Sequence, residues 1–96
     1  MQLDQKWIDV ICKTVDDQIK DSHKVLLFGS RSTGVSKKYS DIDVALVSDC
    51  SISLSQLLRI SGSLEDSSLP YKVDVVDLAR TEGRFRENIL KDGVEL

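Results

Sequence analysis

Residues 25–47, VLLFGSRSTGVSKKYSDIDVALV, form the stretch around which we expect this 96-residue chain to be organised. The stretch predicts two strands, residues 25–28 and 41–47, joined by a Gly-Ser turn and a polar, basic segment. Alternate side chains of a strand point to the same face, so Asp41 and Asp43 should lie side by side. Two carboxylates held that close repel each other. A divalent cation is the partner that we expect to compensate this repulsion.

The sequence on either side of this stretch predicts helices that alternate with strands. Apolar residues from Leu3 to Ile19 recur at helical spacing and indicate an amphipathic first helix. After the second strand, Ser53 and Gln56 have the spacing of a capping box that begins another helix. The apolar stripe of that helix would consist of Leu54, Leu57, Leu58 and Leu64.

The C-terminal third predicts one more strand and one more helix. Residues 71–78, YKVDVVDL, are rich in β-branched side chains and indicate a third strand. Thr81 is expected to cap the last helix, whose apolar face would contain Phe85 and Ile89. Gly93 should end this helix.

Length, composition and charge fit one small domain that spans residues 1–96. With a short fourth strand at residues 94–96, the elements predict an α/β (α+β) fold, a small mixed β-sheet flanked by helices. The net charge of −3 argues against direct DNA binding through phosphate neutralisation. No run approaches the roughly 18 apolar residues of a membrane-spanning helix, and the two cysteines lack CxxC spacing. We therefore expect a cytoplasmic protein that makes no membrane contact, and its small size favours a homo- or hetero-oligomer.

Gly29 and Ser30 lie where the first strand ends, a place where backbone N–H groups can receive phosphate oxygens. Glycine suits this position because it tolerates positive φ and lets the backbone come close to a ligand. Two common phosphate motifs do not fit. Val35 stands where a P-loop requires lysine, and the sequence Gly-Ser-Arg lacks the Gly-x-Gly of a dinucleotide fingerprint.

The remaining pattern is Gly-Ser, a spacer, Asp-x-Asp on the next strand, and a later strand with a third acidic residue. In this chain it comprises Gly29-Ser30, Asp41-Ile42-Asp43 and Asp74 within YKVDVVDL. The pattern resembles the signature of the polymerase-β-like nucleotidyltransferase superfamily. Because the resemblance covers nearly the whole chain, it points to the minimal nucleotidyltransferase (MNT) group, which pairs with HEPN-domain proteins.

The resemblance implies a nucleotidyltransferase that uses ATP with two Mg²⁺ ions. It gives catalytic and metal-binding roles to three carboxylates, Asp41, Asp43 and Asp74. It gives nucleotide-binding roles to Gly29, Ser30 and Arg31. Asp77 lies three residues after Asp74 and therefore on the opposite face of the strand, so we expect it at the surface or at the start of a helix.

The implied reaction transfers a nucleoside monophosphate to a hydroxyl group, and we expect the transferred group to be AMP from ATP. The resemblance suggests a tyrosine of a HEPN toxin as acceptor, which would make this chain an antitoxin. The alternative is a binding module that neutralises its HEPN partner by complex formation without catalysis. Thr33 favours this alternative, because related proteins frequently have arginine at this position. The three acidic residues favour the enzyme.

The few remaining chemically distinctive side chains have structural interpretations. His23 lies in a polar stretch and is expected to be exposed to solvent. Trp7 and Phe85 are expected in the core or in an interface. Aromatic residues make up 5% of the chain, and this low content suggests no base-stacking surface.

Overall fold

The computed structural model describes residues 3–29 and 42–96. These residues form a four-stranded sheet in the order β3-β2-β1-β4. β1 is antiparallel to both β2 and β4, whereas β2 and β3 are parallel. The sheet is therefore mixed, as predicted. The strands are β1 (His23–Phe28), β2 (Ile42–Ser48), β3 (Val73–Asp77) and β4 (Val94–Glu95).

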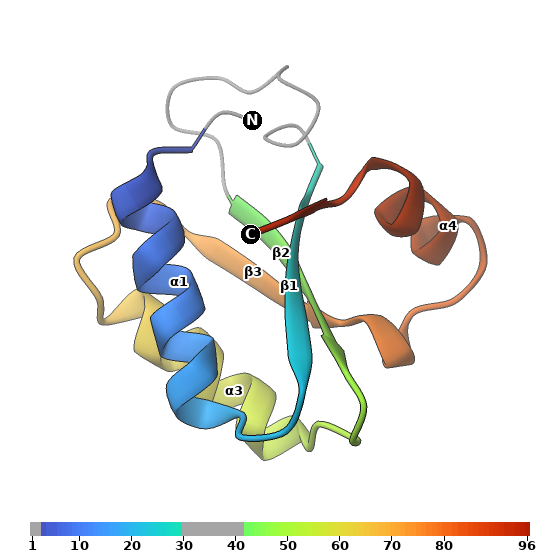
Figure 1. Cartoon of the computed structure of the whole chain (residues 1–96), viewed down its shortest axis with the longest axis horizontal. Helices are drawn as coiled ribbons and strands as arrows, with labels where there is room; N and C mark the ends of the chain where they lie inside the picture. Colours follow the sequence, from blue (N-terminus) through green and yellow to red (C-terminus); the bar gives the residue numbers. More distant parts are fainter. Residues whose placement is uncertain (1–2, 30–41) are drawn as a thin grey trace.

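The helices cover both faces of this sheet. Figure 1 shows α1 and α3 together on one side of the strands and α4 on the other. The parallel pair β2 and β3 needs a crossover connection, and α3 supplies it. The helices are α1 (Gln5–Gln18), α3 (Leu54–Glu65) and α4 (Gly83–Asp92), with a short 3₁₀-helix η1 (Leu78–Arg80) after β3. None of the helices in the described ranges has the length and apolar character that crossing a membrane requires.

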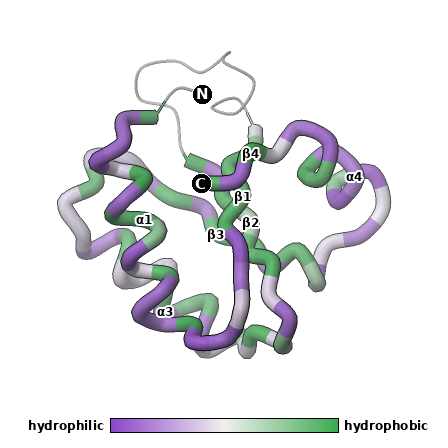
Figure 2. Tube along the Cα trace, in the orientation of Figure 1, coloured by the Kyte–Doolittle hydropathy of each residue, from purple (hydrophilic) through white to green (hydrophobic). Residues whose placement is uncertain are grey.

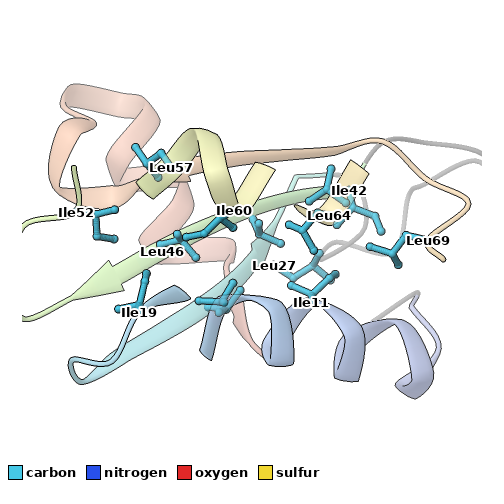
Figure 3. Packing of buried hydrophobic residues seen from close by; sticks show 14 residues of the cluster. Ile11, Ile19, Leu27, Ile42, Leu46, Ile52, Leu57, Ile60, Leu64 and Leu69 are labelled. Atoms are coloured by element: carbon cyan, nitrogen blue, oxygen red, sulfur yellow. The ribbon is translucent and has the colours of Figure 1, made fainter. Parts of the chain in front are cut away.

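The larger hydrophobic core lies between the sheet and the pair α1 and α3. Figure 3 shows side chains from both helices and from the central strands converging there, among them the fully buried Ile11, Leu27 and Ile60. Trp7 packs against the edge of this core, as expected. Helical periodicity explains why these two helices contribute to the core. Hydrophobic and hydrophilic residues alternate along α1 and α3 (Figure 2), so each helix has one apolar face.

A smaller core lies on the opposite face of the sheet, beneath α4. Ile89 of α4 is 1% exposed and packs with Ala45 of β2 and Leu78 of η1. Leu26 and Phe28 of β1 border this cluster. The prediction that Ile89 faces the core is confirmed, and this contact holds α4 against β1.

The start of α3 matches the prediction, but its apolar stripe is narrower. Ser53 accepts a hydrogen bond from the backbone N–H of Gln56, whose side chain accepts one from the backbone N–H of Ser53. Leu57 and Leu64 are buried as predicted. The assignment of Leu54 and Leu58 to the apolar stripe was wrong for the buried face, because they are 61% and 68% exposed. Ile60, which the predicted stripe did not include, is buried with Leu57 and Leu64 instead.

The beginning of α4 differs from the prediction. Glu82, not Thr81, occupies the N-cap position, and its side chain makes no capping hydrogen bond. The hydroxyl of Thr81 instead donates to the carbonyl of Leu78 and closes η1. Phe85 is 50% exposed and so contributes only in part to the apolar face. Gly93 directly follows the last residue of α4 and the short strand β4 comes after it, as predicted.

His23 is largely buried, contrary to the expectation of an exposed side chain. The side chain is 13% exposed, and Nε2 lies 2.7 Å from Oδ1 of Asp16 in α1. Nδ1 lies 2.7 Å from the backbone carbonyl of Asp21. This carbonyl contact is the main cause that raises the pKa of His23; burial lowers it in part, and Asp16 raises it. The imidazole thus ties the end of α1 to the start of β1.

Candidate active site

A row of side chains crosses three strands on the face of the sheet that carries α4. Phe28 of β1 is paired with Asp43 of β2, and Asp43 is paired with Asp74 of β3. Residues paired in register project to the same face, and neighbouring strands are about 4.8 Å apart. The two carboxylates are therefore neighbours, with an aromatic ring on one side.

The two aspartates differ in their exposure to solvent. Asp43 is half-buried between Ile42 and Val44, whose buried side chains point into the larger core. Asp74 is exposed on β3, between the buried Val73 and the half-buried Val75. The alternation of polar and apolar residues along both strands thus brings the carboxylates to one face. Asp74 is the more accessible of the two to a second molecule.

Gly29 brings the backbone close to Asp43. Its φ of +78° is a conformation that other residues rarely adopt. A Cβ atom at this position would lie 2.7 Å from Oδ2 of Asp43. Any other residue would be strained in this turn, and its Cβ atom would displace the Asp43 carboxylate. The chain therefore leaves β1 directly against the carboxylate.

The other residues of the predicted site, Ser30, Arg31 and Asp41, lie outside the described residues. So do Thr33 and Val35. Their predicted roles remain predictions.

Asp77 has a structural role on the other face of the sheet. It is 6% exposed, so the expectation of a surface position was wrong. Its Oδ1 accepts a hydrogen bond from the backbone N–H of Ala79, which places it at the start of η1 as the second expectation had it. Its Oδ2 lies 3.3 Å from Nε of Arg80. Burial of this carboxylate is thus compensated by groups of the turn that follows it.

The neighbouring carboxylates have the chemistry of a magnesium site. Carboxylate oxygens are the protein ligands that Mg²⁺ prefers, and the ion commonly takes one or two of them together with phosphate oxygens. Asp43 and Asp74 on adjacent strands fit that pattern. In the described part of the chain no group of three or more His, Cys, Asp or Glu side chains could hold a metal ion. The third predicted ligand is Asp41, outside that part.

A pocket of about 300 Å³ opens next to Gly29, and the sequence analysis had not predicted it. Its lining residues come from the end of β1 and from one face of α4: Phe28, Gly29, Phe85, Asn88, Ile89 and Asp92. The rings of Phe28 and Phe85 meet edge to face, with centroids 5.9 Å apart. The signal in the sequence was the spacing of Phe85, Asn88 and Asp92, which puts polar residues on the same face of a helix as an aromatic one.

Comparison with known proteins gives consistent matches over most of the chain. Residues 10–96 match the family described as "Polymerase beta, Nucleotidyltransferase". The chain is 40% identical over 91 residues to a probable protein adenylyltransferase MntA of Haemophilus influenzae. This alignment covers 94% of the chain and 80% of that relative.

Two solved structures support the same relationship. A crystal structure of a toxin–antitoxin with AMP-PNP contains a chain with a TM-score of 0.79 and 26% identity. The match covers 97% of this chain and 72% of that one. A structure of the tri-AMPylated HEPN toxin of Shewanella oneidensis in complex with its MNT antitoxin gives a TM-score of 0.76 at 25% identity. Here the match covers 99% of this chain and 71% of the other.

Proposed function

This chain belongs to the polymerase β nucleotidyltransferase family, and on that premise we propose that it transfers AMP from ATP to a hydroxyl group of a HEPN toxin. The observation that carries the proposal is the pairing of Asp43 with Asp74 directly beside the backbone of Gly29. This arrangement places metal-binding carboxylates next to a turn suited to phosphate oxygens. The similarity to a probable protein adenylyltransferase supports AMP as the transferred group.

In this proposal Asp43 and Asp74, together with Asp41, would hold two Mg²⁺ ions. When bound, Mg²⁺ lowers the pKa of the acceptor hydroxyl and neutralises charge on the departing pyrophosphate. Gly29 and Ser30 receive the β- and γ-phosphates through backbone N–H groups, and Arg31 adds positive charge. The acceptor oxygen forms a bond to the α-phosphorus, the bond to the bridging oxygen of pyrophosphate breaks, and the hydroxyl proton leaves to solvent. The products are an AMP ester of the acceptor and pyrophosphate.

The partner in this proposal is a HEPN toxin, and the acceptor is one of its tyrosines. The support for the partner is the structure of an MNT antitoxin bound to a tri-AMPylated HEPN toxin. A tyrosine hydroxyl loses its proton far more easily than an aliphatic hydroxyl, since its pKa is about 10. Asp74 is exposed, so a side chain of another protein can reach the carboxylate pair. Modification of the toxin would then be the means by which this chain acts as antitoxin.

The test is the transfer of radioactive label to proteins of a host lysate in the presence of Mg²⁺. ATP labelled at the α-phosphate is compared with ATP labelled at the γ-phosphate. We expect the wild-type chain to transfer only the α-label. Asp43→Asn should lower the transfer more than 100-fold, because changes at residues that only support a metal ligand already cost about 10–100-fold. Asp49→Asn, which removes the same charge at an exposed site outside the row, should keep full activity.

Three outcomes contradict parts of the proposal. Transfer of the γ-label would indicate a kinase. Equal transfer by wild type and Asp43→Asn would remove Asp43 from the site. Absence of label with both chains, while a HEPN partner co-purifies with both, would establish the non-catalytic binding module instead.

A further inference from the structure

We propose that the pocket between β1 and α4 binds the adenine base of ATP, with Phe28 and Phe85 as its aromatic wall and Asn88 and Asp92 as the residues that recognise the base edge. This inference rests on the proposed function, because it assigns a place to one part of the same substrate. It makes α4 the element that selects the nucleotide.

The position of the pocket relative to the carboxylates supports this assignment. Gly29 lines the pocket and also approaches Oδ2 of Asp43, so the pocket opens beside the predicted phosphate site. Phe28, another lining residue, is the strand partner of Asp43. A nucleotide with its phosphates at Gly29 and Asp43 can therefore place its base over β1. Asp74 lies on the opposite side of Asp43 and stays accessible to the acceptor.

The size and lining of the pocket fit a nucleobase. Its volume of about 300 Å³ is at the lower end of the range for small-molecule sites. The wall combines two aromatic rings and the buried Ile89 with two polar side chains. Such a combination, mostly apolar with few polar groups, is typical of sites that bind small molecules, and its aromatic rings suit a flat base.

Phe85 has the exposure that a stacking residue requires. It is 50% exposed although it is a large hydrophobic residue, and it lines the pocket. Its ring meets Phe28 edge to face at 77°, so the contact fixes the ring without covering both of its faces. An aromatic face of this kind can stack against a base. The low aromatic content had suggested no such surface, but two phenylalanines far apart in the sequence meet here.

The polar residues of the pocket match the edge of adenine. Phe85, Asn88 and Asp92 follow one another at spacings of three and four, which places them along one face of α4. The Asn88 amide both donates and accepts, as pairing with the N6 amine and a ring nitrogen of adenine requires. Asp92 can only accept when ionised, which suits the amine and disfavours the keto oxygens of guanine and uracil at the same place.

The experiment compares the binding of two ligands in the presence of Mg²⁺ by calorimetry. One is α,β-methylene-ATP, which cannot be cleaved at the bond that the reaction breaks, and the other is inorganic tripolyphosphate. We expect Phe85→Ala to raise the Kd of the ATP analogue about tenfold and to leave the Kd of tripolyphosphate unchanged. Phe85→Leu, which keeps apolar contact with Phe28 but has no aromatic face, should have the same effect. Leu90→Ala, at a 56% exposed position of the same helix outside the pocket, should change neither.

Base selection gives a second readout. The wild-type chain should bind α,β-methylene-ATP more tightly than α,β-methylene-GTP, and Asn88→Leu should reduce this preference severalfold. Equal affinity of wild type for the ATP analogue and tripolyphosphate, or an unchanged Kd in both Phe85 variants, would overturn the inference and leave the proposed function standing. Failure of both ligands to bind with Mg²⁺ would overturn the proposed function as well.

Discussion

Gly29 has both an unusual backbone conformation and a place beside the carboxylates of the candidate site. The residue combines a positive φ with an approach to Asp43 so close that a Cβ atom could fit only if the carboxylate moved. The sequence suggested glycine here for phosphate binding, and the structure shows a further reason, the contact with the carboxylate. A change at this residue should therefore affect stability and nucleotide binding together.

We predict that Gly29→Ala lowers the free energy of unfolding by about 1–2 kcal/mol, the cost of a left-handed conformation for a residue with a Cβ atom. The new methyl group would also push the Asp43 carboxylate away, so binding of Mg²⁺ with α,β-methylene-ATP should weaken at least tenfold. Urea denaturation and calorimetry measure the two effects.

Gly62→Ala is the matched control for this prediction. Gly62 lies within α3, and an added Cβ would meet nothing within 4 Å. Alanine has the higher helix propensity, so this variant should gain roughly 0.5–1 kcal/mol and bind nucleotide normally. Equal stability losses in both variants would mean that backbone conformation at Gly29 does not limit substitution.

Helix α3 forms its local capping motif as predicted, but its buried face differs from the prediction. The Ser53–Gln56 capping box forms as its spacing predicts, because its hydrogen bonds lie within one turn. The apolar stripe was predicted less well. Leu54 and Leu58 are good helix formers on an exposed side of α3, and which side of a helix packs against the sheet is settled by contacts with distant residues.

We predict that Ser53→Ala costs about 1 kcal/mol of unfolding free energy, the usual value for loss of an N-cap side chain. Thermal denaturation should show a lower Tm. Ser55→Ala, two residues later at an exposed position within the helix, should leave the Tm unchanged or raise it slightly. A drop of the same size in both variants would show that the loss comes from removing a hydroxyl and not from the cap.

For the whole molecule, the two faces of the sheet have separate roles. The face covered by α1 and α3 holds most of the buried hydrophobic side chains, whereas the other face holds the smaller core, the carboxylate pair and the pocket. Period-two alternation in the strands separates these roles, since each residue can face only one way. Stability and chemistry should therefore respond to different substitutions.

We predict that Leu64→Ala destabilises the protein by about 2–5 kcal/mol, because Leu64 is 1% exposed in the larger core. At a temperature low enough for Leu64→Ala to stay folded, this variant should keep the wild-type Kd for α,β-methylene-ATP. Asp74→Asn should behave in the opposite way, with an unchanged Tm and a strong loss of AMP transfer. Loss of transfer in folded Leu64→Ala with full activity in Asp74→Asn would reverse the roles of the two faces.

The order of helices and strands along the chain, and the parity that separates Asp74 from Asp77, could be predicted from the sequence alone. Each of these follows from short-range periodicity, in which neighbours along the chain constrain one another. The sequence also carried the Gly-Ser and Asp-x-Asp pattern that led to the family.

The role of α4 could not be foreseen from the sequence and follows from its packing. Its position against β1 creates the Phe28–Phe85 contact and the pocket, and it leaves Phe85 half-exposed. The same holds for His23, which is covered because the end of α1 comes back to β1. These features depend on contacts between segments 7 to 57 residues apart in the sequence, whose packing no local pattern specifies.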